Sequence, residues 1–323
     1  MEYSAEINTI GGPEVIQIVK TDLKRPVGNE VLVRHKAIGI NYIDIYYRNG
    51  MYPLASLPGK LGHEASGIVE EIGESVTTIK IGDRVAYVTA SPGSYSTSRI
   101  VSENDLIKLP KEIDFETAAA MMLKGMTVNY LFKRTANLQS FHKILFHAAA
   151  GGTGLIALQW ARMLGVKTIG TVGSEEKKDL AKNHGANFVI NYSRQDFVEI
   201  VREITEGVGV DVVFDSIGKQ TFYQSIQCLK KYGLMVSFGN ASGKVASFDL
   251  GLLNGNLFIT RPTLFSYIAT RKELEITANE LMQLVALKKL HIPIHQKFDL
   301  TEVAEAHKNL QDRRTTGCTI LTV

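Results

Sequence analysis

The sequence predicts an α/β protein with two domains, a β-rich barrel domain and a domain built on a doubly wound parallel sheet. Short β-like runs broken by glycine and proline fill the first 122 residues. From about residue 125 onward, strands alternate with helices. The length of 323 residues also favours two domains, because it exceeds what one hydrophobic core usually organises.

The barrel domain is predicted from strands and turns in the N-terminal region. Its clearest β-like runs are residues 31–33, 67–72 and 84–88. Glycine- and proline-containing turns are expected at residues 11–13, 58–59 and 82–83. The tail returns to a helix over 273–290, which is compatible with packing on either domain, and to a last strand over 318–323.

The second domain is predicted from repeated β-α-β units, which form a parallel sheet with helices on both faces. Strands are expected at residues 143–147, 166–172, 188–192, 211–215 and 234–238. Helices are expected at residues 154–164, 175–183 and 196–205. We therefore assign residues 125–266 to the parallel-sheet domain, and residues 1–124 with 267–323 to the barrel domain.

A run of small residues between a predicted strand and helix indicates a phosphate-binding turn. Ala149, Gly151 and Gly154 follow a variant of the glycine pattern that lets a pyrophosphate approach the backbone at a helix N-terminus. The alternative is a tight turn with no nucleotide. The residues expected at the cofactor are Ala150, Gly151, Gly152, Thr153 and Gly154.

The end of the second strand of this domain favours NADPH over NADH. NAD sites usually place a carboxylate there, and residues 172–174 contain none. The residues expected around the 2′-phosphate are Gly173, Ser174, Lys177 and Tyr192. Glu175 and Glu176 argue against this assignment, since they are also typical of a solvated helix start.

A longer motif supports an oxidoreductase. Gly62-His63-Glu64 is followed by glycines at 67 and 73 and by Val76, and this pattern resembles the signature of the medium-chain dehydrogenase/reductase superfamily. The chain is most similar to the quinone oxidoreductase (zeta-crystallin-like) branch, and to its bacterial members. The further matching segments are residues 11–15, 37–44, 124–127, 146–154, 234–239 and 260–262. The resemblance implies a catalytic GroES-like barrel domain and a Rossmann domain.

Zinc is not expected. In zinc alcohol dehydrogenases of this superfamily the signature histidine is a metal ligand that works with two cysteines. Here Asn41 takes the upstream cysteine position, residues 123–127 hold no cysteine, and His63 is left as the one matching ligand. A zinc site needs three or four protein ligands. We therefore expect His63 to be a packed or hydrogen-bonded residue.

The resemblance also implies which residues face the reacting part of the cofactor. It places the nicotinamide in a cleft against Asn41, Tyr46, Tyr52 and Thr127, which are the candidate catalytic residues. Simple packing is the alternative role for the two tyrosines. Phe238 and Gly239 are expected near the nicotinamide ribose. Arg313 is expected to reach the cofactor from the returning tail, and a surface ion pair is its alternative role. His147 is expected to be structural.

The expected activity is zinc-independent hydride transfer from NADPH to a quinone, with the cofactor carrying the chemistry. An enone or enoyl double-bond reductase is one alternative, and a crystallin-like or RNA-binding NADPH protein is another. A net charge of +3 without a dense basic run argues against nucleic acid as the main partner. The resemblance implies a homodimer joined through an edge strand at 257–260. No signal peptide and no membrane span are expected. A cytoplasmic location is expected, because Cys228 and Cys318 form no disulfide framework.

Overall fold

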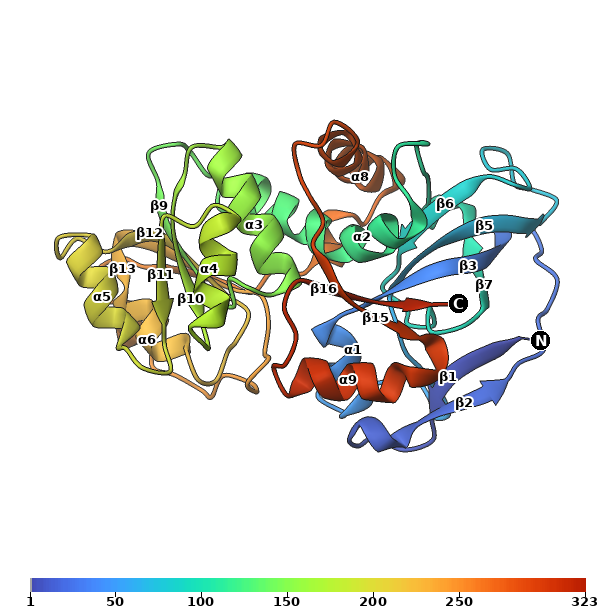
Figure 1. The fold of residues 1–323 in the computed structure, drawn as a ribbon, viewed down its shortest axis with the longest axis horizontal. Helices are drawn as coiled ribbons and strands as arrows, with labels where there is room; N and C mark the ends of the chain where they lie inside the picture. Colours follow the sequence, from blue (N-terminus) through green and yellow to red (C-terminus); the bar gives the residue numbers. More distant parts are fainter. Residues whose placement is uncertain (1) are drawn as a thin grey trace. The chain divides into compact units, whose positions relative to one another are not determined.

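The computed structural model describes residues 2–323, which divide into two compact units (Figure 1). Unit 1 runs as far as Met126 and includes Tyr267–Val323, and unit 2 is Thr127–Ser266. Unit 1 holds two sheets, and unit 2 holds one parallel sheet. The prediction of a barrel-type β domain with a parallel-sheet domain is therefore confirmed as a fold class.

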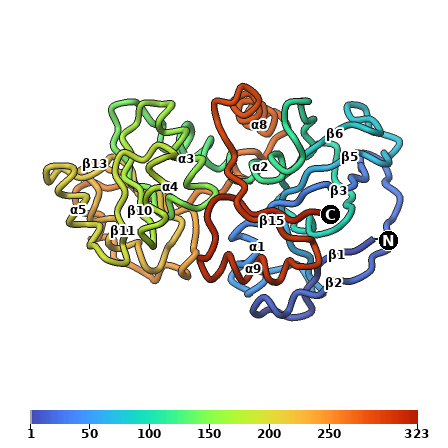
Figure 2. The backbone as a smooth tube through the Cα atoms, in the orientation of Figure 1, coloured from blue at the N-terminus to red at the C-terminus, as the bar shows by residue number. Residues whose placement is uncertain are grey.

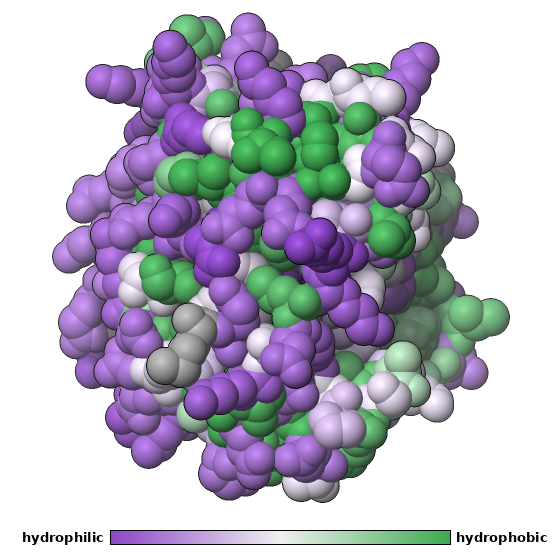
Figure 3. All heavy atoms as spheres, turned by 90° about the vertical axis from the view of Figure 1, so that its right-hand side faces the viewer, coloured by the Kyte–Doolittle hydropathy of each residue, from purple (hydrophilic) through white to green (hydrophobic). Residues whose placement is uncertain are grey.

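Unit 1 is built on a seven-stranded sheet in the order β15-β16-β3-β5-β6-β8, in which β7 also pairs with β3. These strands are β3 Glu30–Ile40, β5 Glu64–Ile72, β6 Arg84–Val88, β7 Ser98–Ser102, β8 Leu106–Lys108, β15 Ile294–Asp299 and β16 Cys318–Thr322. A three-stranded sheet consists of β1 Tyr3–Ile7, β2 Ile16–Lys20 and β4 Gly59–Lys60. Apolar residues of both sheets form one buried cluster with helix α9 Val303–Gln311. On the face that Figure 3 shows, groups of hydrophobic side chains are separated by hydrophilic ones.

Three further helices contribute to unit 1. Helix α1 is Tyr42–Arg48, and α8 is Arg271–Ala286 with a capping box between Thr270 and Glu273. Helix α2, Phe115–Tyr130, begins in unit 1 and continues into unit 2 as a π-helical turn over Leu131–Thr135. Short 3-10 turns lie at Pro13–Val15, Glu103–Asp105 and Leu300–Glu302. The tail helix that was compatible with either domain belongs to unit 1.

Helix α2 was not predicted from the sequence. Its central residues 118–122 are all apolar and fully buried, so it lacks the one-sided pattern of a surface helix. Its start was nevertheless marked, because the Asp114 carboxylate accepts hydrogen bonds from the backbone N–H and the hydroxyl of Thr117. No helix of residues 2–323 is long and apolar enough to cross a membrane.

Unit 2 contains a six-stranded, fully parallel sheet in the order β11-β10-β9-β12-β13-β14. Its strands are β9 Lys143–Phe146, β10 Lys167–Val172, β11 Phe188–Asn191, β12 Val210–Asp215, β13 Leu229–Ser237 and β14 Phe258–Thr260. The predicted strands are confirmed, but β13 begins five residues earlier than expected. Its helices are α3 Gly152–Met163, α4 Glu176–Asn183, α5 Phe197–Ile204, α6 Phe222–Gln227 and the short α7 Leu264–Tyr267, with a 3-10 turn at Leu250–Leu253.

The helices cover both faces of this sheet, as the tube in Figure 2 shows. Neighbouring residues of β11 point to opposite faces: Ile190 packs in the cluster with α5 and α6, and Val189 packs in the cluster with α3 and α4. The strand order turns back between β9 and β12, so their carboxyl ends frame the crevice where parallel sheets of this kind bind ligands.

Candidate functional site

The turn between β9 and α3 has the geometry of an anion-binding helix start. Ala148 adopts a left-handed conformation with φ 53°, and the Gly151 N–H donates to its carbonyl oxygen over 3.0 Å. Gly151 is extended and caps α3, which begins at Gly152. The first N–H groups of α3 have no partner within the helix and point out of its start. The residue that makes the tight turn is thus Ala148, whereas the sequence pattern indicated the next residue, Ala149.

Glycine is required at position 154 for the helix to pack on the strand. A Cβ there would lie 2.6 Å from the Ala149 carbonyl oxygen and closer still to that of Ala148. A Cβ at Gly151 would meet one backbone atom only, the Ala148 oxygen at 3.3 Å. The two glycines therefore have different roles: Gly154 allows close packing, and Gly151 leaves the approach to the backbone open.

The carboxyl ends of β10 and β11 bring two of the predicted 2′-phosphate residues, Gly173 and Tyr192, together. A Cβ at Gly173 would lie 3.0 Å from the Tyr192 hydroxyl, so the phenol reaches over this glycine. The Ser193 hydroxyl donates to the Gly173 carbonyl oxygen over 2.9 Å and ties the two strand ends together. Ser174 lies in the connection between β10 and α4, and Lys177 lies in the first turn of α4.

The two carboxylates that argued against NADPH are engaged by neighbouring residues. A hydrogen bond from Asn191, with help from Lys178 and Arg194, lowers the pKa of Glu175. A hydrogen bond from Ser174, with a contribution from Arg194, lowers the pKa of Glu176. Arg194 was missed in the sequence, because its approach to α4 depends on how the loop after β11 folds back.

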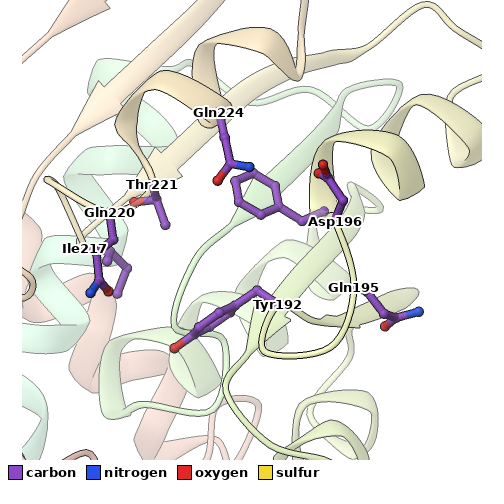
Figure 4. Close-up of a pocket in the computed structure, with 8 residues that line it drawn as sticks. Tyr192, Gln195, Asp196, Ile217, Gln220, Thr221 and Gln224 are labelled. Carbon is purple, nitrogen blue, oxygen red and sulfur yellow. The ribbon is translucent and has the colours of Figure 1, made fainter.

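A pocket lies at the carboxyl ends of β11 and β12, and Figure 4 shows Tyr192 on one side of it and Ile217 and Gln220 on another. Its lining combines two aromatic rings with amide, hydroxyl and carboxylate groups, which suits a flat heterocycle that needs both stacking and hydrogen bonds. The lining residues are Tyr192, Gln195, Asp196, Phe197, Ile217, Gln220, Thr221 and Gln224.

Asp215, at the end of β12, organises the loop that forms one side of this pocket. One carboxylate oxygen accepts from the backbone N–H groups of Ile217 (2.7 Å) and Gly218 (3.0 Å). The other accepts from the hydroxyls of Thr221 (2.7 Å) and Ser225 (3.0 Å). The carboxylate is fully buried, so these four bonds replace its hydration. Sequence reasoning did not identify this role, because the partners become visible only when α6 is placed.

His147 extends the same network to β10. Because Ser225 donates to Asp215, its oxygen accepts from His147 Nε2 over 2.9 Å, and His147 Nδ1 then accepts from the Thr171 hydroxyl over 2.8 Å. Burial lowers the pKa of His147 and keeps the ring neutral, although Asp215 acts in the opposite direction. The expected structural role of His147 is consistent with this placement.

Replacing Asp215 with asparagine is expected to lower the free energy of unfolding by about 2 kcal/mol, because an amide NH₂ would face hydroxyls that now donate. Urea unfolding measures this, and hydrogen exchange at the amides of Ile217 and Gly218 should become faster. The control is Asp211→Asn at the other end of the same strand, where an ion pair with Lys230 is partly exposed and should contribute less than about 1 kcal/mol. Equal losses in both variants would contradict the proposed role.

Phe238 and Gly239 follow β13 beside the same loop. The Phe238 N–H donates to the Asp215 carbonyl oxygen over 2.8 Å, and a Cβ at Gly239 would lie 2.5 Å from the Ser216 carbonyl oxygen. These two predicted residues therefore lie at the crevice side of unit 2. Arg313 lies in unit 1 after α9 with φ 59°, and its role at the cofactor stays a prediction.

Unit 1 gathers the predicted tyrosines on and after α1. The ring centroids of Tyr46 and Tyr52 are 5.2 Å apart in an edge-on arrangement, and the Tyr52 N–H donates to the Tyr46 carbonyl oxygen. Tyr47, which sequence reasoning passed over, lies edge-on to Tyr52 at 5.8 Å and also contacts the ring of His63. Burial, with Tyr52 and Asp44 nearby, raises the pKa of Tyr47.

His63 is a buried, hydrogen-bonded histidine, as expected from the sequence. Its Nδ1 lies 2.7 Å from Asp44 Oδ1, and both side chains are fully buried. Burial raises the pKa of Asp44, but bonds from His63 and Tyr95 outweigh it and the pKa falls below its usual range. Among residues 2–323, no three histidine, cysteine, aspartate or glutamate side chains are arranged to hold a metal ion.

The side chains of Asn41 and Thr127 are both almost inaccessible to solvent, and they lie on different elements. Asn41 caps α1, and its Nδ2 donates to Glu64 Oε1 over 2.7 Å. Thr127 lies on α2, three residues after Lys124. Their joint action on a nicotinamide, together with Tyr46 and Tyr52, stays a prediction.

Comparison with known proteins agrees with this geometry. Residues 28–111 match the family model of the alcohol dehydrogenase GroES-like domain, and residues 152–286 match that of the zinc-binding dehydrogenases. A quinone oxidoreductase of Pseudomonas aeruginosa is 50% identical over 96% of both chains. A 2-haloacrylate reductase of a Burkholderia species is 42% identical over 99% of both.

A solved structure extends the likeness to the whole fold. The crystal structure of Escherichia coli quinone oxidoreductase complexed with NADPH superimposes with a TM-score of 0.98 at 47% identity, covering 99% of this chain and 100% of the other. The same family membership is indicated by the fold of both units, by the β9–α3 turn and by the sequence identity across nearly the full length. The chain belongs to the quinone oxidoreductase branch of the medium-chain dehydrogenase/reductase superfamily.

Proposed function

We propose that this protein is an NADPH-dependent quinone oxidoreductase that transfers hydride from NADPH to a quinone without a metal ion. The observation that carries the proposal is the β9–α3 turn at the switch point of the sheet, with its left-handed Ala148 and its open helix start. NADPH supplies the hydride, while the protein supplies position and electrostatics. The names of the relatives support NADPH and quinone as the reactants.

Unit 2 would hold the adenosine half of the cofactor. The pyrophosphate would lie against Gly151 and Gly152, and the adenine would enter the pocket beside Tyr192. Unit 1 would act as the catalytic domain, with Asn41, Tyr46 and Tyr52 beside the nicotinamide. The tyrosines offer flat apolar rings and hydroxyl groups, which can accommodate a quinone ring and donate to its oxygen as negative charge develops.

A turnover assay tests this function. Purified protein is mixed with NADPH or NADH, and the loss of nicotinamide absorbance is followed with a benzoquinone, a naphthoquinone and an enone. We expect quinone-dependent oxidation with NADPH preferred. Tight NADPH binding without turnover of any acceptor would contradict the enzymatic proposal and leave the cofactor-binding, crystallin-like alternative. Faster reduction of the enone would favour a double-bond reductase, which the similarity to the 2-haloacrylate reductase supports.

Lys177→Ala is expected to weaken NADPH binding about tenfold and to leave NADH binding unchanged, because only NADPH carries the 2′-phosphate that an ammonium group can bind. Titration of the nicotinamide fluorescence gives both Kd values. Lys178→Ala is the matched control, since Lys178 pairs with Glu175 at 3.3 Å, and it should change both affinities by less than about twofold. An unchanged NADPH affinity in Lys177→Ala would remove this residue from the phosphate site.

We further propose a homodimer formed through β14. This strand ends the sheet and pairs with β13 alone among the described strands, and Phe258 on it is 59% exposed. Light scattering after size exclusion should give twice the mass of the chain, and Phe258→Lys should shift the species toward the monomer. A monomeric mass for the unmodified protein would contradict the proposal.

Two buried free thiols, Cys228 and Cys318, support a cytoplasmic location.

A further inference from the structure

The fully buried carboxylate of Glu64 gathers three donors at the start of β5 in unit 1. Its Oε1 accepts from Asn41 Nδ2 over 2.7 Å and from Lys124 Nζ over 3.1 Å. Its Oε2 accepts from the Leu123 N–H over 2.6 Å. Both side chains of the Glu64–Lys124 pair are nearly or fully inaccessible to solvent. Neither residue was singled out in the sequence for a role at the site.

The pair holds both the backbone before Asn41 and the Asn41 side chain. Burial lowers the pKa of Lys124, but the negative charge of Glu64 outweighs this and raises the pKa above its ordinary value. Lys124 Nζ also donates to the carbonyl oxygen of Ile40, the residue before Asn41, over 3.0 Å. Lys124 thus fixes the backbone before Asn41 as well as the carboxylate that binds the Asn41 side chain.

The neighbouring strand leaves room for this carboxylate. A Cβ at Gly39 would lie 2.5 Å from Glu64 Cδ, and it would also overlap the Ala119 carbonyl oxygen. Gly39 has no positive φ, so contact with these groups is what requires a glycine. An apolar replacement of a buried ion pair is often equally stable, so stability alone does not account for the arrangement.

Each oxygen of Glu64 faces a group that can only donate, the Lys124 ammonium at Oε1 and the Leu123 N–H at Oε2. The NH₂ end of the Asn41 amide must therefore face Glu64, and the amide is prevented from turning over. We propose that Glu64 and Lys124 are positioning residues that fix the Asn41 amide in one orientation, so that its carbonyl end is available to the donors of the nicotinamide half of the cofactor. This inference rests on the proposed function, because it takes Asn41 to contact that half.

The test compares three proteins with the unmodified enzyme: Asn41→Ala, the neutral pair variant Glu64→Gln/Lys124→Met, and the triple variant. A glutamine can donate or accept, so the pair variant should release the amide. We expect Asn41→Ala and the pair variant each to weaken NADPH binding about tenfold. The triple variant should be no weaker than either, since effects that act through one group do not multiply.

Two further variants keep the outcome decisive. Glu64→Asp retains the charge but withdraws the carboxylate, so it should weaken NADPH binding even if the pair variant does not fold. Lys108→Met/Asp83→Asn neutralises a partly exposed pair of unit 1 at 2.9 Å and should leave the NADPH affinity unchanged. Nuclear magnetic resonance gives a second readout: the Asn41 side-chain NH₂ signals, assigned by their loss in Asn41→Ala, should move in the Glu64 variants.

Losses that multiply in the triple variant would overturn the positioning role, as would NH₂ signals that stay in place. An unchanged affinity in Asn41→Ala would overturn it as well. A protein that binds NADPH but reduces no acceptor would refute the proposed activity, while the Kd cycle and the NH₂ signals would still decide the positioning role.

Discussion

Gly154→Ala is expected to lower the free energy of unfolding by about 3 kcal/mol and to abolish measurable NADPH binding. The added Cβ would lie 2.6 Å from the Ala149 carbonyl oxygen and nearer to that of Ala148, and both atoms belong to the backbone of the turn. Backbone cannot move aside as a flexible side chain can. Helix α3 would have to shift away from β9, which would distort the turn that receives the pyrophosphate.

Gly151→Ala is the matched control, because the two substitutions separate packing from ligand approach. Its Cβ would meet only the Ala148 oxygen, at 3.3 Å, so a shift of a few tenths of an ångström accommodates it. We expect a free energy of unfolding within about 1 kcal/mol of that of the unmodified protein, but strongly weakened NADPH binding. Thermal unfolding and cofactor titration on both variants measure these effects. Full NADPH affinity in Gly151→Ala would show that the pyrophosphate lies elsewhere.

The parts of the site that could be predicted are those encoded by adjacent residues. The small residues from Ala149 to Gly154 report a turn that is closed by its own residues, through the bond from the Gly151 N–H to the Ala148 oxygen. The absence of a carboxylate from residues 172–174 is equally local. The missed residues act through distant partners. Asp215 is recognised as an organiser only when α6 brings Ser225 to it, and Glu64 only when α2 brings Lys124 to it.

The distinction between local and distant contacts also explains which elements of the fold could be predicted. The strands of unit 2 were predicted because each is a short apolar run between turns, and the order of the runs implies a parallel sheet. Helix α2 was missed because burial on all sides removes the periodic pattern that marks a helix. The Leu131–Thr135 π-helical turn has no comparable sequence signal.

The hydrogen-bond partners of buried histidines, and the pKa values that follow from their burial, are also not revealed by the sequence. His307, on α9, accepts from Arg48 at Nδ1 over 3.1 Å, so its Nε2 donates to the Tyr95 hydroxyl over 2.9 Å. Tyr95 in turn donates to Asp44 over 2.8 Å. This chain joins α1 to the C-terminal helix with every donor matched to an acceptor. Burial lowers the pKa of His307 to about 4, although Asp44 opposes this.

His35 provides another buried neutral imidazole, and it makes the expected acid response testable. Its Nδ1 donates to the Ser96 carbonyl oxygen over 2.7 Å, so its Nε2 must accept from the Tyr87 hydroxyl over 2.9 Å. Burial lowers its pKa to about 4, although the bond to Ser96 acts in the opposite direction. Protonation would place two donors against each other at Nε2.

We expect the free energy of unfolding to fall as the pH is lowered from 6.5 to 4, by about 3 kcal/mol for each of these histidines. The unfolded chain, with histidine pKa values near 6.5, binds protons in this range that the folded protein does not, so stability is complete above pH 6.5 and is lost below it. His35→Gln should remove about 3 kcal/mol of this dependence, because an uncharged amide can donate to Ser96 and accept from Tyr87. The control His291→Gln changes an exposed side chain and should leave the dependence intact. Urea unfolding at a series of pH values measures the slope, and an equally steep slope in His35→Gln would mean that other groups cause the acid sensitivity.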